Sequence, residues 1–440
     1  MTLSSRLKRR FKFIGENISI HGVKFLVSDA HIAYKVIWCC TLFWFFFIMQ
    51  DMIVSTLKHS KADSVAVNID TSYARWENNF PSIAICFRKD RSCEGLFSFL
   101  DEYFGDNPPP QKRSFYRFAQ TYAFIAPART VNEISLDVCL AYNATCGLNL
   151  DVIQAKAMPT TCSDFILSTK YLGEERKCEE LLTLERTEMG ICYTTRAVKK
   201  PLKFSRKSPF PIQLEFEYKA SDGYGMDLFI FSPGESVTSY DTPFALPKVG
   251  SYLFVGLLLT ETKSQKEVQA VDPSIRRCKF TFEKTPVYNF PYSVANCHME
   301  LRIQEEMKAC NCTAPVNRYP HLKYCDIHGL NCLKTIKRKG VPKNSDDPVV
   351  DDSGCVALCT EMQITVTGNY MRESRELAGK GKVIIEITNL PNMRYIRTLM
   401  TKDLDIIVIC SSIVGLFTGA SILSLLEIFY LIIFRKYTNM

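Results

Sequence analysis

Residues 406–434 read IIVICSSIVGLFTGASILSLLEIFYLIIF, and this stretch decides how the rest of the chain is organised. About 20 apolar residues, each rising 1.5 Å along a helix, cross a hydrocarbon layer of about 30 Å, so the stretch is long enough to span a bilayer. It is polar for a simple anchor, because serine, threonine and glycine interrupt it and one acid, Glu427, lies in its second half. An unpaired charge inside a bilayer costs about 3 kcal/mol or more. We therefore expect Glu427 to face water or protein.

The second half of this stretch has the pattern of a helix that lines a passage. At about 100° per residue, Ala420, Ser424 and Glu427 fall on one face of a continuous helix, while leucine, isoleucine and phenylalanine cover the rest. Gly419 lets the helix break, and small side chains from Gly419 to Ser421 allow backbone carbonyls to line a narrow passage. Carbonyl oxygens bind dehydrated cations. The pattern therefore predicts a cation pathway.

The alternative interpretation is that this stretch packs against another helix and lines no passage. Ser411, Gly415 and Gly419 are spaced by four residues, which is typical of a small-residue seam against another helix, and on this spacing alone packing is the better interpretation. Glu427 favours a pore, because acids contributed by symmetry-related subunits attract cations whereas a packing seam has no use for an acid.

Residues 415–427, GLFTGASILSLLE, closely resemble the second membrane helix of the degenerin, epithelial sodium channel and acid-sensing ion channel superfamily. A Gly-x-Ser motif forms the selectivity filter there, and Gly419, Ala420 and Ser421 match it. The resemblance further implies that Gly415 is at the amiloride-contact position and Val408 at the gate position. Ser424 and Glu427 are expected to be pore residues because they lie on the polar face of the helix.

The N-terminal segment carries a second similarity. His21 and Gly22 resemble the His-Gly gating element that precedes the first membrane helix in this superfamily. A His-Gly pair alone is typical of an ordinary turn, and its position shortly before an apolar segment favours the gating role. The first membrane helix is expected at residues 36–57, where aromatic residues dominate without a small polar stripe, as in a lipid-facing helix.

Charge placement predicts the orientation. Lysine and arginine concentrate in residues 1–30 and recur at Arg435 and Lys436, just outside the two apolar stretches. Positive charge stays on the cytoplasmic side, so a multi-pass protein of the plasma membrane with both termini in the cytoplasm is expected. A cleavable signal peptide is not expected, because the first apolar segment begins only at Val36. The net charge of +8 is too diffuse to indicate nucleic-acid binding.

Residues 58–403 contain no further apolar stretch of spanning length and are predicted to form an extracellular domain. Apolar and polar residues alternate at 213–218, 278–283 and 383–387, which predicts strands. Phe80–Cys86 resembles the superfamily's first palm strand after the first span. A β-rich α+β body above two membrane helices is the expected architecture.

The cysteine content fits an oxidising compartment. Of 18 cysteines, 15 lie between the apolar stretches. Pairing does not follow from sequence alone, and the resemblance implies five disulfides: Cys86 with Cys192, Cys278 with Cys359, Cys297 with Cys355, Cys310 with Cys332, and Cys312 with Cys325. Cys162 and Cys178 are expected to form a sixth pair, although the family's usual partner position falls nearer Thr169. Cys93, Cys139 and Cys146 remain, and Cys139 is expected to pair with Cys146. A zinc site at Cys310, Cys312, Cys325, His328 and Cys332 is the alternative, which we reject because extracellular thiolates oxidise.

Sequons at Asn143 and Asn311 fall in the predicted extracellular part and are expected to carry glycans. Walker, His-Glu-x-x-His and Gly-x-Ser-x-Gly motifs are absent from the sequence, so no enzyme is expected.

The resemblance implies a trimeric membrane protein with palm, finger, thumb and β-ball subdomains, most like the insect pickpocket branch. The expected divisions are a cytoplasmic segment (1–35), a first membrane helix (36–57), an extracellular domain (58–403, with a thumb at about 288–365), a second membrane helix (404–434) and a cytoplasmic tail (435–440).

The implied function is a sodium-preferring, amiloride-sensitive cation channel subunit gated by an extracellular chemical or mechanical stimulus. Its expected partners are identical or related subunits and membrane lipid, with no nucleic acid; sodium is the permeant ion, and neither a cofactor nor a metal site is expected. An ATP-gated type of trimeric channel is one alternative, opposed by the Gly419–Ser421 motif and by the lack of a basic nucleotide site. A non-conducting two-span receptor or adhesion protein is the other.

Overall fold

The computed structural model describes residues 12–13, 15–62, 65–73, 76–88, 94–106, 112–126, 150–157, 161–195, 202–219, 226–238, 241–314, 322–336, 354–400 and 403–433. The chain divides into two units. The first contains Met1–Val67, Gln265–Arg276 and Arg397–Met440, and the second contains Asn68–Ser264 and Arg277–Ile396.

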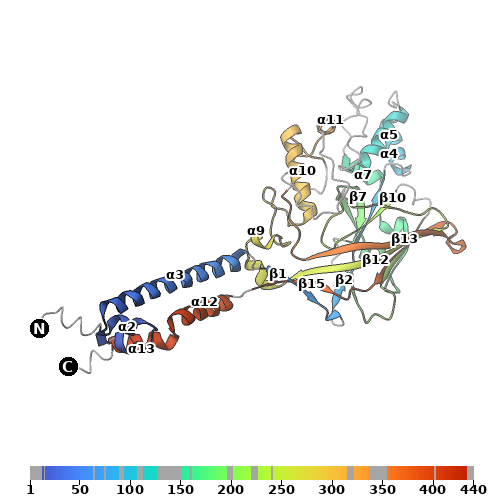
Figure 1. The fold of residues 1–440 in the computed structure, drawn as a ribbon. Helices are drawn as coiled ribbons and strands as arrows, with labels where there is room; N and C mark the ends of the chain where they lie inside the picture. Colours follow the sequence, from blue (N-terminus) through green and yellow to red (C-terminus); the bar gives the residue numbers. More distant parts are fainter. Residues whose placement is uncertain are drawn as a thin grey trace. The chain divides into compact units, whose positions relative to one another are not determined.

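The first unit is mainly helical. Its described elements are α2 (Val23–Val27), α3 (Ile32–Ala62), η4 (Lys266–Ala270), α9 (Pro273–Arg276), α12 (Asp403–Thr418) and α13 (Ile422–Ile433). Helices α3 and α12 lie side by side (Figure 1), with the rings of Phe45 and Phe417 5.9 Å apart. Large apolar side chains of α3 point outward, and Trp44 is 70% exposed. Such a surface needs an apolar environment.

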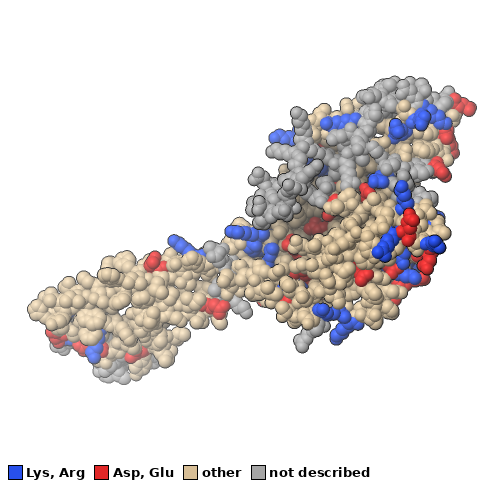
Figure 2. Space-filling model, turned by 45° about the vertical axis from the view of Figure 1, so that its right-hand side comes forward, with Lys and Arg blue, Asp and Glu red and all other residues tan. Residues whose placement is uncertain are grey.

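Among the described residues, one helix is by itself long and apolar enough to cross a membrane, over Ile32–Ser60. The segments Leu404–Thr418 and Ile422–Tyr430 qualify only together, as a pair bent by 62° at a short break. The second apolar stretch is therefore not one straight helix. Figure 2 shows few charged side chains on the helical unit between its ends.

The described strands of the second unit, together with the strands at its borders, form three sheets. The largest has eight strands in the order β1-β15-β12-β14-β9-β4-β5, with β13 paired to β12. Its strands are β1 (Val65–Asp70), β4 (Ile166–Tyr171), β5 (Glu174–Arg176), β9 (Gln213–Lys219), β12 (Ser251–Ser264), β13 (Glu361–Glu373), β14 (Lys380–Asn389) and β15 (Arg394–Leu399).

The second sheet has five strands in the order β11-β10-β3-β7-β6, and the third pairs β2 with β8. Their strands are β2 (Glu77–Asn79), β3 (Ser82–Phe87), β6 (Thr183–Thr187), β7 (Gly190–Thr194), β8 (Lys203–Ser205), β10 (Met226–Phe231) and β11 (Phe244–Ala245). The helices of this unit are α4 (Glu94–Phe104), α5 (Lys112–Ala123), α7 (Leu150–Ala157), η3 (Cys162–Asp164), α8 (Cys178–Leu181), α10 (Val294–Cys310), α11 (Ile327–Thr335) and η5 (Arg375–Leu377).

Two predicted strands are confirmed at the centre of the large sheet. β9 and β14 pair antiparallel, with Phe216 opposite Val383 and Leu214 opposite Ile385. All four side chains are buried. The alternation in sequence identified these strands because one face of each packs into the core.

The strand predicted at residues 278–283 is wrong. Lys279 forms an isolated bridge with Leu358, and the chain then turns. The turn is held by the backbone N–H of Phe280, which donates to the Glu283 carboxylate at 2.6 Å, and by the Glu283 N–H, which donates to the Phe280 carbonyl at 3.0 Å. A side chain that satisfies a backbone donor competes with strand pairing.

The prediction that Phe80–Cys86 is the first palm strand is wrong, because this segment is not the first strand after α3. β1 and β2 precede it, and the segment contributes to β3, between β10 and β7 in the five-stranded sheet. β1 was missed because it is short and largely exposed, so it lacks the apolar alternation of a half-buried strand.

Six disulfides join described cysteines, and they are the six expected pairs: Cys86–Cys192, Cys162–Cys178, Cys278–Cys359, Cys297–Cys355, Cys310–Cys332 and Cys312–Cys325. Cys86 and Cys192 stand directly opposite each other on β3 and β7. Cys93, Cys139, Cys146, the sequon residue Asn143 and the tail 435–440 lie outside the described residues. Asn311 is exposed at the end of α10, and its glycosylation stays a prediction.

Candidate functional site

The break between α12 and α13 lies at the Gly419–Ser421 motif. α12 ends at Thr418, and Gly419 follows with a φ of +64°, in the left-handed region. A glycine in this conformation is a common helix stop, because it has no Cβ to strain. The Thr418 hydroxyl strengthens the stop, since it donates to the Val414 carbonyl at 2.7 Å and accepts from the Ala420 N–H at 3.1 Å.

The same motif starts the next helix. The N–H of Ser424 donates to the Ser421 hydroxyl at 3.2 Å, and the N–H of Ser421 donates to the Ser424 hydroxyl at 3.2 Å. This reciprocal pair satisfies two donors at the start of α13, as a capping box does. Gly419 and Ser421 therefore end one helix and begin another within three residues.

The N-terminal segment packs against this break. The N–H of His21 donates to the carbonyl of Thr418 at 2.8 Å, which satisfies a carbonyl at the end of α12. The imidazole of His21 fills the space over Gly419, where an added Cβ would lie 2.1 Å from its Nδ1 atom. Gly419 is required here for its φ and for the close approach of His21.

Two further contacts hold the same segment. Ser19 donates its hydroxyl hydrogen to the carboxylate of Glu427. Gly22 has a φ of +85°, and a Cβ there would lie 2.8 Å from the side chain of Leu42 on α3. The segment is thus fitted between α3 and the break, and glycine suits position 22 for two independent reasons.

The other predicted pore residues lie on α12. Gly415 accepts the N–H of Gly419 at 2.8 Å, and an added Cβ would make only an ordinary contact, 3.6 Å from the Ala420 carbonyl oxygen. Val408 is 56% exposed, and its carbonyl accepts from the Ser412 hydroxyl at 2.8 Å. The structure therefore brings His21 to Gly419 and leaves Val408 outside that cluster.

The common face predicted for Ala420, Ser424 and Glu427 is wrong. It requires a continuous helix, and the helix breaks between Ala420 and Ser424. Ser424 is only 5% exposed, because it caps α13 and lies beside Ser19. The Ser-x-x-Ser spacing of Ser421 and Ser424 was a usable signal for this second helix start, and the contact of Ser19 had no signal in the sequence.

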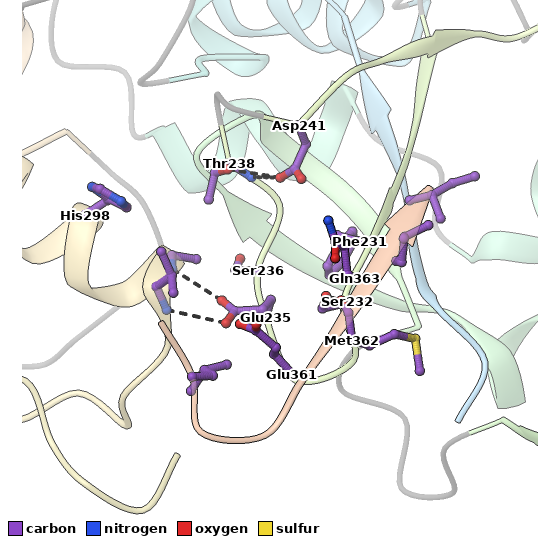
Figure 3. A pocket seen from close by; sticks show the side chains of 15 residues that line it. Phe231, Ser232, Glu235, Ser236, Thr238, Asp241, His298, Glu361, Met362 and Gln363 are labelled. Atoms are coloured by element: carbon purple, nitrogen blue, oxygen red, sulfur yellow. Dashed lines mark hydrogen bonds between the residues drawn. The ribbon is translucent and has the colours of Figure 1, made fainter. Parts of the chain in front are cut away.

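The second unit contains an acid-lined cavity of about 630 Å³ that no sequence motif indicated (Figure 3). Glu235 accepts from the backbone N–H groups of Val294 and Ala295 at the start of α10, at 3.4 and 3.3 Å. Asp241 accepts from the Thr238 N–H at 2.7 Å. Burial raises the pKa of both carboxyl groups. Glu235 therefore holds the start of α10 to the loop after β10, and Asp241 holds the turn of that loop at Thr238.

The thiols required by the zinc alternative are consumed by the disulfides Cys310–Cys332 and Cys312–Cys325. Within the part of the chain that the structure describes, no group of His, Cys, Asp and Glu is placed to hold a metal ion.

Comparison with known proteins gives one family. The family model described as "Amiloride-sensitive sodium channel" matches residues 14–431. Pickpocket protein 19 of Drosophila melanogaster is 21% identical, covering 94% of this chain and 88% of the relative. Sodium channel protein Nach of Drosophila ananassae is 21% identical, covering 99% and 89%, and Pickpocket protein 28 of Drosophila melanogaster is 21% identical, covering 99% and 80%.

Proposed function

Because the chain belongs to the amiloride-sensitive sodium channel family, we propose that it is a pore-forming subunit of a sodium-preferring cation channel. Members of this family are membrane-embedded ion channels that assemble as oligomers of subunits, and they are not enzymes. The finer proposal is a homotrimer or heterotrimer in the plasma membrane, with α3 and the broken pair α12–α13 as the two spans and both termini in the cytoplasm. An extracellular chemical or mechanical stimulus opens it.

The observation that supports the proposal most strongly is the helix break at Gly419–Ser421, whose backbone groups are capped and which packs against His21. Breaking a membrane helix exposes backbone groups, which is tolerated only where they face protein or water. In this chain Thr418 O and the first donors of α13 are satisfied by protein, while Gly419, Ala420 and Ser421 have small side chains. We propose that these three residues form the selectivity filter, with Gly415 and Val408 above it and Ser424 and Glu427 below.

The test is to express the chain alone and with related subunits, and to record currents across a panel of stimuli. Ser421→Ala removes a helix cap worth about 1 kcal/mol and should raise potassium permeability relative to sodium, measured as a shift of reversal potential. Ser28→Ala is the matched control, since the Ser28 hydroxyl donates to the nearby Phe25 carbonyl at 3.0 Å. An unchanged permeability ratio in Ser421→Ala would remove the filter assignment, and a surface-expressed chain with no current under any condition would contradict the channel function.

Replacing Val408 with phenylalanine tests the gate. If Val408 packs against neighbouring subunits in a closed pore, the added bulk should destabilise the closed state by about 1–3 kcal/mol through overpacking. That is about a ten- to hundredfold shift toward the open state, seen as constitutive sodium current. Unchanged resting current and unchanged stimulus response, in a channel present at the surface, would place Val408 against lipid.

A further inference from the structure

We propose that Ser19 is a positioning residue for Glu427, so that the N-terminal segment sets the electric field at the inner end of the pore. The inference rests on the proposed channel function, and it assigns a residue outside both membrane segments to ion conduction. The two partners are separated by 408 residues in sequence.

The geometry is a chain of side-chain oxygens across the break. The Ser421 and Ser424 hydroxyls are 3.3 Å apart, and the Ser424 hydroxyl lies 3.5 Å from that of Ser19. Ser19 in turn donates to the Glu427 carboxylate. Ser19 therefore links the first turn of α13, where the proposed filter ends, to the acid that follows it.

The main chain of the segment fixes this position. Two residues after Ser19, the His21 N–H is bonded to the Thr418 carbonyl at 2.8 Å. Gly22 then approaches Leu42 closely on α3. The main chain is therefore anchored two residues after Ser19, and this anchor keeps the Ser19 hydroxyl within reach of the Glu427 carboxylate.

The chemistry explains why the hydroxyl matters. A carboxylate among apolar side chains is costly unless donors compensate it, and a hydrogen bond to a charged group contributes about 1.5–3 kcal/mol. Without the Ser19 donor, the carboxylate has to turn toward water to find another donor. This movement changes the position of the negative charge that concentrates cations at the pore mouth.

A double-mutant cycle tests the inference in full-length channels at the surface. The variants are Ser19→Ala, Ser19→Thr, Glu427→Gln, the double variant Ser19→Ala/Glu427→Gln, and Ser28→Ala as the matched control in the same segment. The measurement is single-channel sodium conductance at about 20 mM and about 500 mM salt, since fixed charges are screened at the higher concentration.

We expect Ser19→Ala and Glu427→Gln each to lower conductance about twofold at low salt and to approach the wild type at high salt. The double variant should conduct like Glu427→Gln alone, because the hydroxyl acts through the carboxylate. Ser19→Thr keeps a hydroxyl and should conduct like the wild type, and Ser28→Ala should also have wild-type conductance.

Additive losses in the double variant would overturn the inference, and so would wild-type conductance in Ser19→Ala or in Glu427→Gln. If Ser19→Ala fails to reach the surface, Ser19→Cys and Ser19→Thr carry the comparison: a Ser19→Cys conductance below wild type but not below Glu427→Gln supports the inference, and equality with wild type rejects it. Absence of sodium current in the wild type under every stimulus is a different outcome, because it rejects the channel proposal itself.

Discussion

Replacing Gly419 with alanine is expected to lower sodium current by at least about tenfold without a matching loss of surface protein. The new Cβ would lie 2.1 Å from Nδ1 and 2.3 Å from Cε1 of His21, so the imidazole has to leave its place. Alanine at a φ of +64° costs about 1 kcal/mol more than glycine, and overpacking costs about 1–3 kcal/mol. A total of about 2–4 kcal/mol is sufficient to make the state in which the N-terminal segment packs against Gly419 a minor one.

The steric part of this effect should be reversible. His21→Ala empties the space over Gly419, so the double variant His21→Ala/Gly419→Ala should conduct better than Gly419→Ala alone. Gly379→Ala is the control for backbone strain, because Gly379 has a φ of +79° with nothing within 4 Å of an added Cβ. Equal currents in the single and double variants, recorded at matched surface abundance, would show that His21 does not occupy this space in the working channel.

Replacing Arg302 with methionine is expected to cause a large loss of stability in the second unit. The guanidinium donates to Glu188 at 3.1 Å and to Glu306 at 2.8 Å, and it joins α10 to the turn between β6 and β7. Glu306 also accepts from the Thr313 hydroxyl at 2.6 Å. Because both acids are buried, removing the cation leaves uncompensated charges and should cost about 3–5 kcal/mol.

The measurement is the thermal unfolding midpoint of full-length protein in detergent, which should fall on the order of 10 °C, together with reduced mature protein at the surface. Lys308→Met removes a positive charge from an exposed position of the same helix and should change neither quantity. A midpoint for Arg302→Met within experimental error of the control would show that the buried triad of Arg302, Glu188 and Glu306 contributes no net stability.

The pH dependence of this triad has a defined sign. Burial opposes ionisation of Glu306, but the Arg302 guanidinium and hydrogen bonds from Thr313 and Ala314 outweigh it, so the pKa of Glu306 lies below its ordinary value. A lowered pKa means that the folded state binds the proton less readily than the unfolded chain does. The stabilisation is therefore complete above the ordinary glutamate pKa and is lost as pH falls through the lowered value. The difference between wild type and Arg302→Met should shrink below about pH 4.

The pKa shifts of the two acids in the cavity, Glu235 and Asp241, have the opposite sign. Burial raises the pKa of Glu235 and Asp241, so their ionisation destabilises the folded state as pH rises from the ordinary carboxyl range through the raised values. Glu235→Gln should remove part of this penalty while keeping an oxygen that accepts from the start of α10. Unfolding midpoints measured from pH 4 to pH 7 should accordingly fall less steeply in Glu235→Gln than in the wild type.

Local patterns of residues determined much of this protein. The length of the apolar stretches, the alternation that forms β9 and β14, and the glycine and serines that end α12 and begin α13 act over a few neighbouring residues, so they can be recognised in the chain itself. The turn at residues 280–283 shows the limit of such patterns, because the Glu283 side chain bonds a backbone donor that strand pairing would otherwise use. Only the tertiary structure decided the neighbours of the break. His21 lies over Gly419 and Ser19 donates to Glu427 because folding brings together residues about 400 positions apart, and hydrogen bonds and close packing depend on that proximity rather than on spacing along the chain.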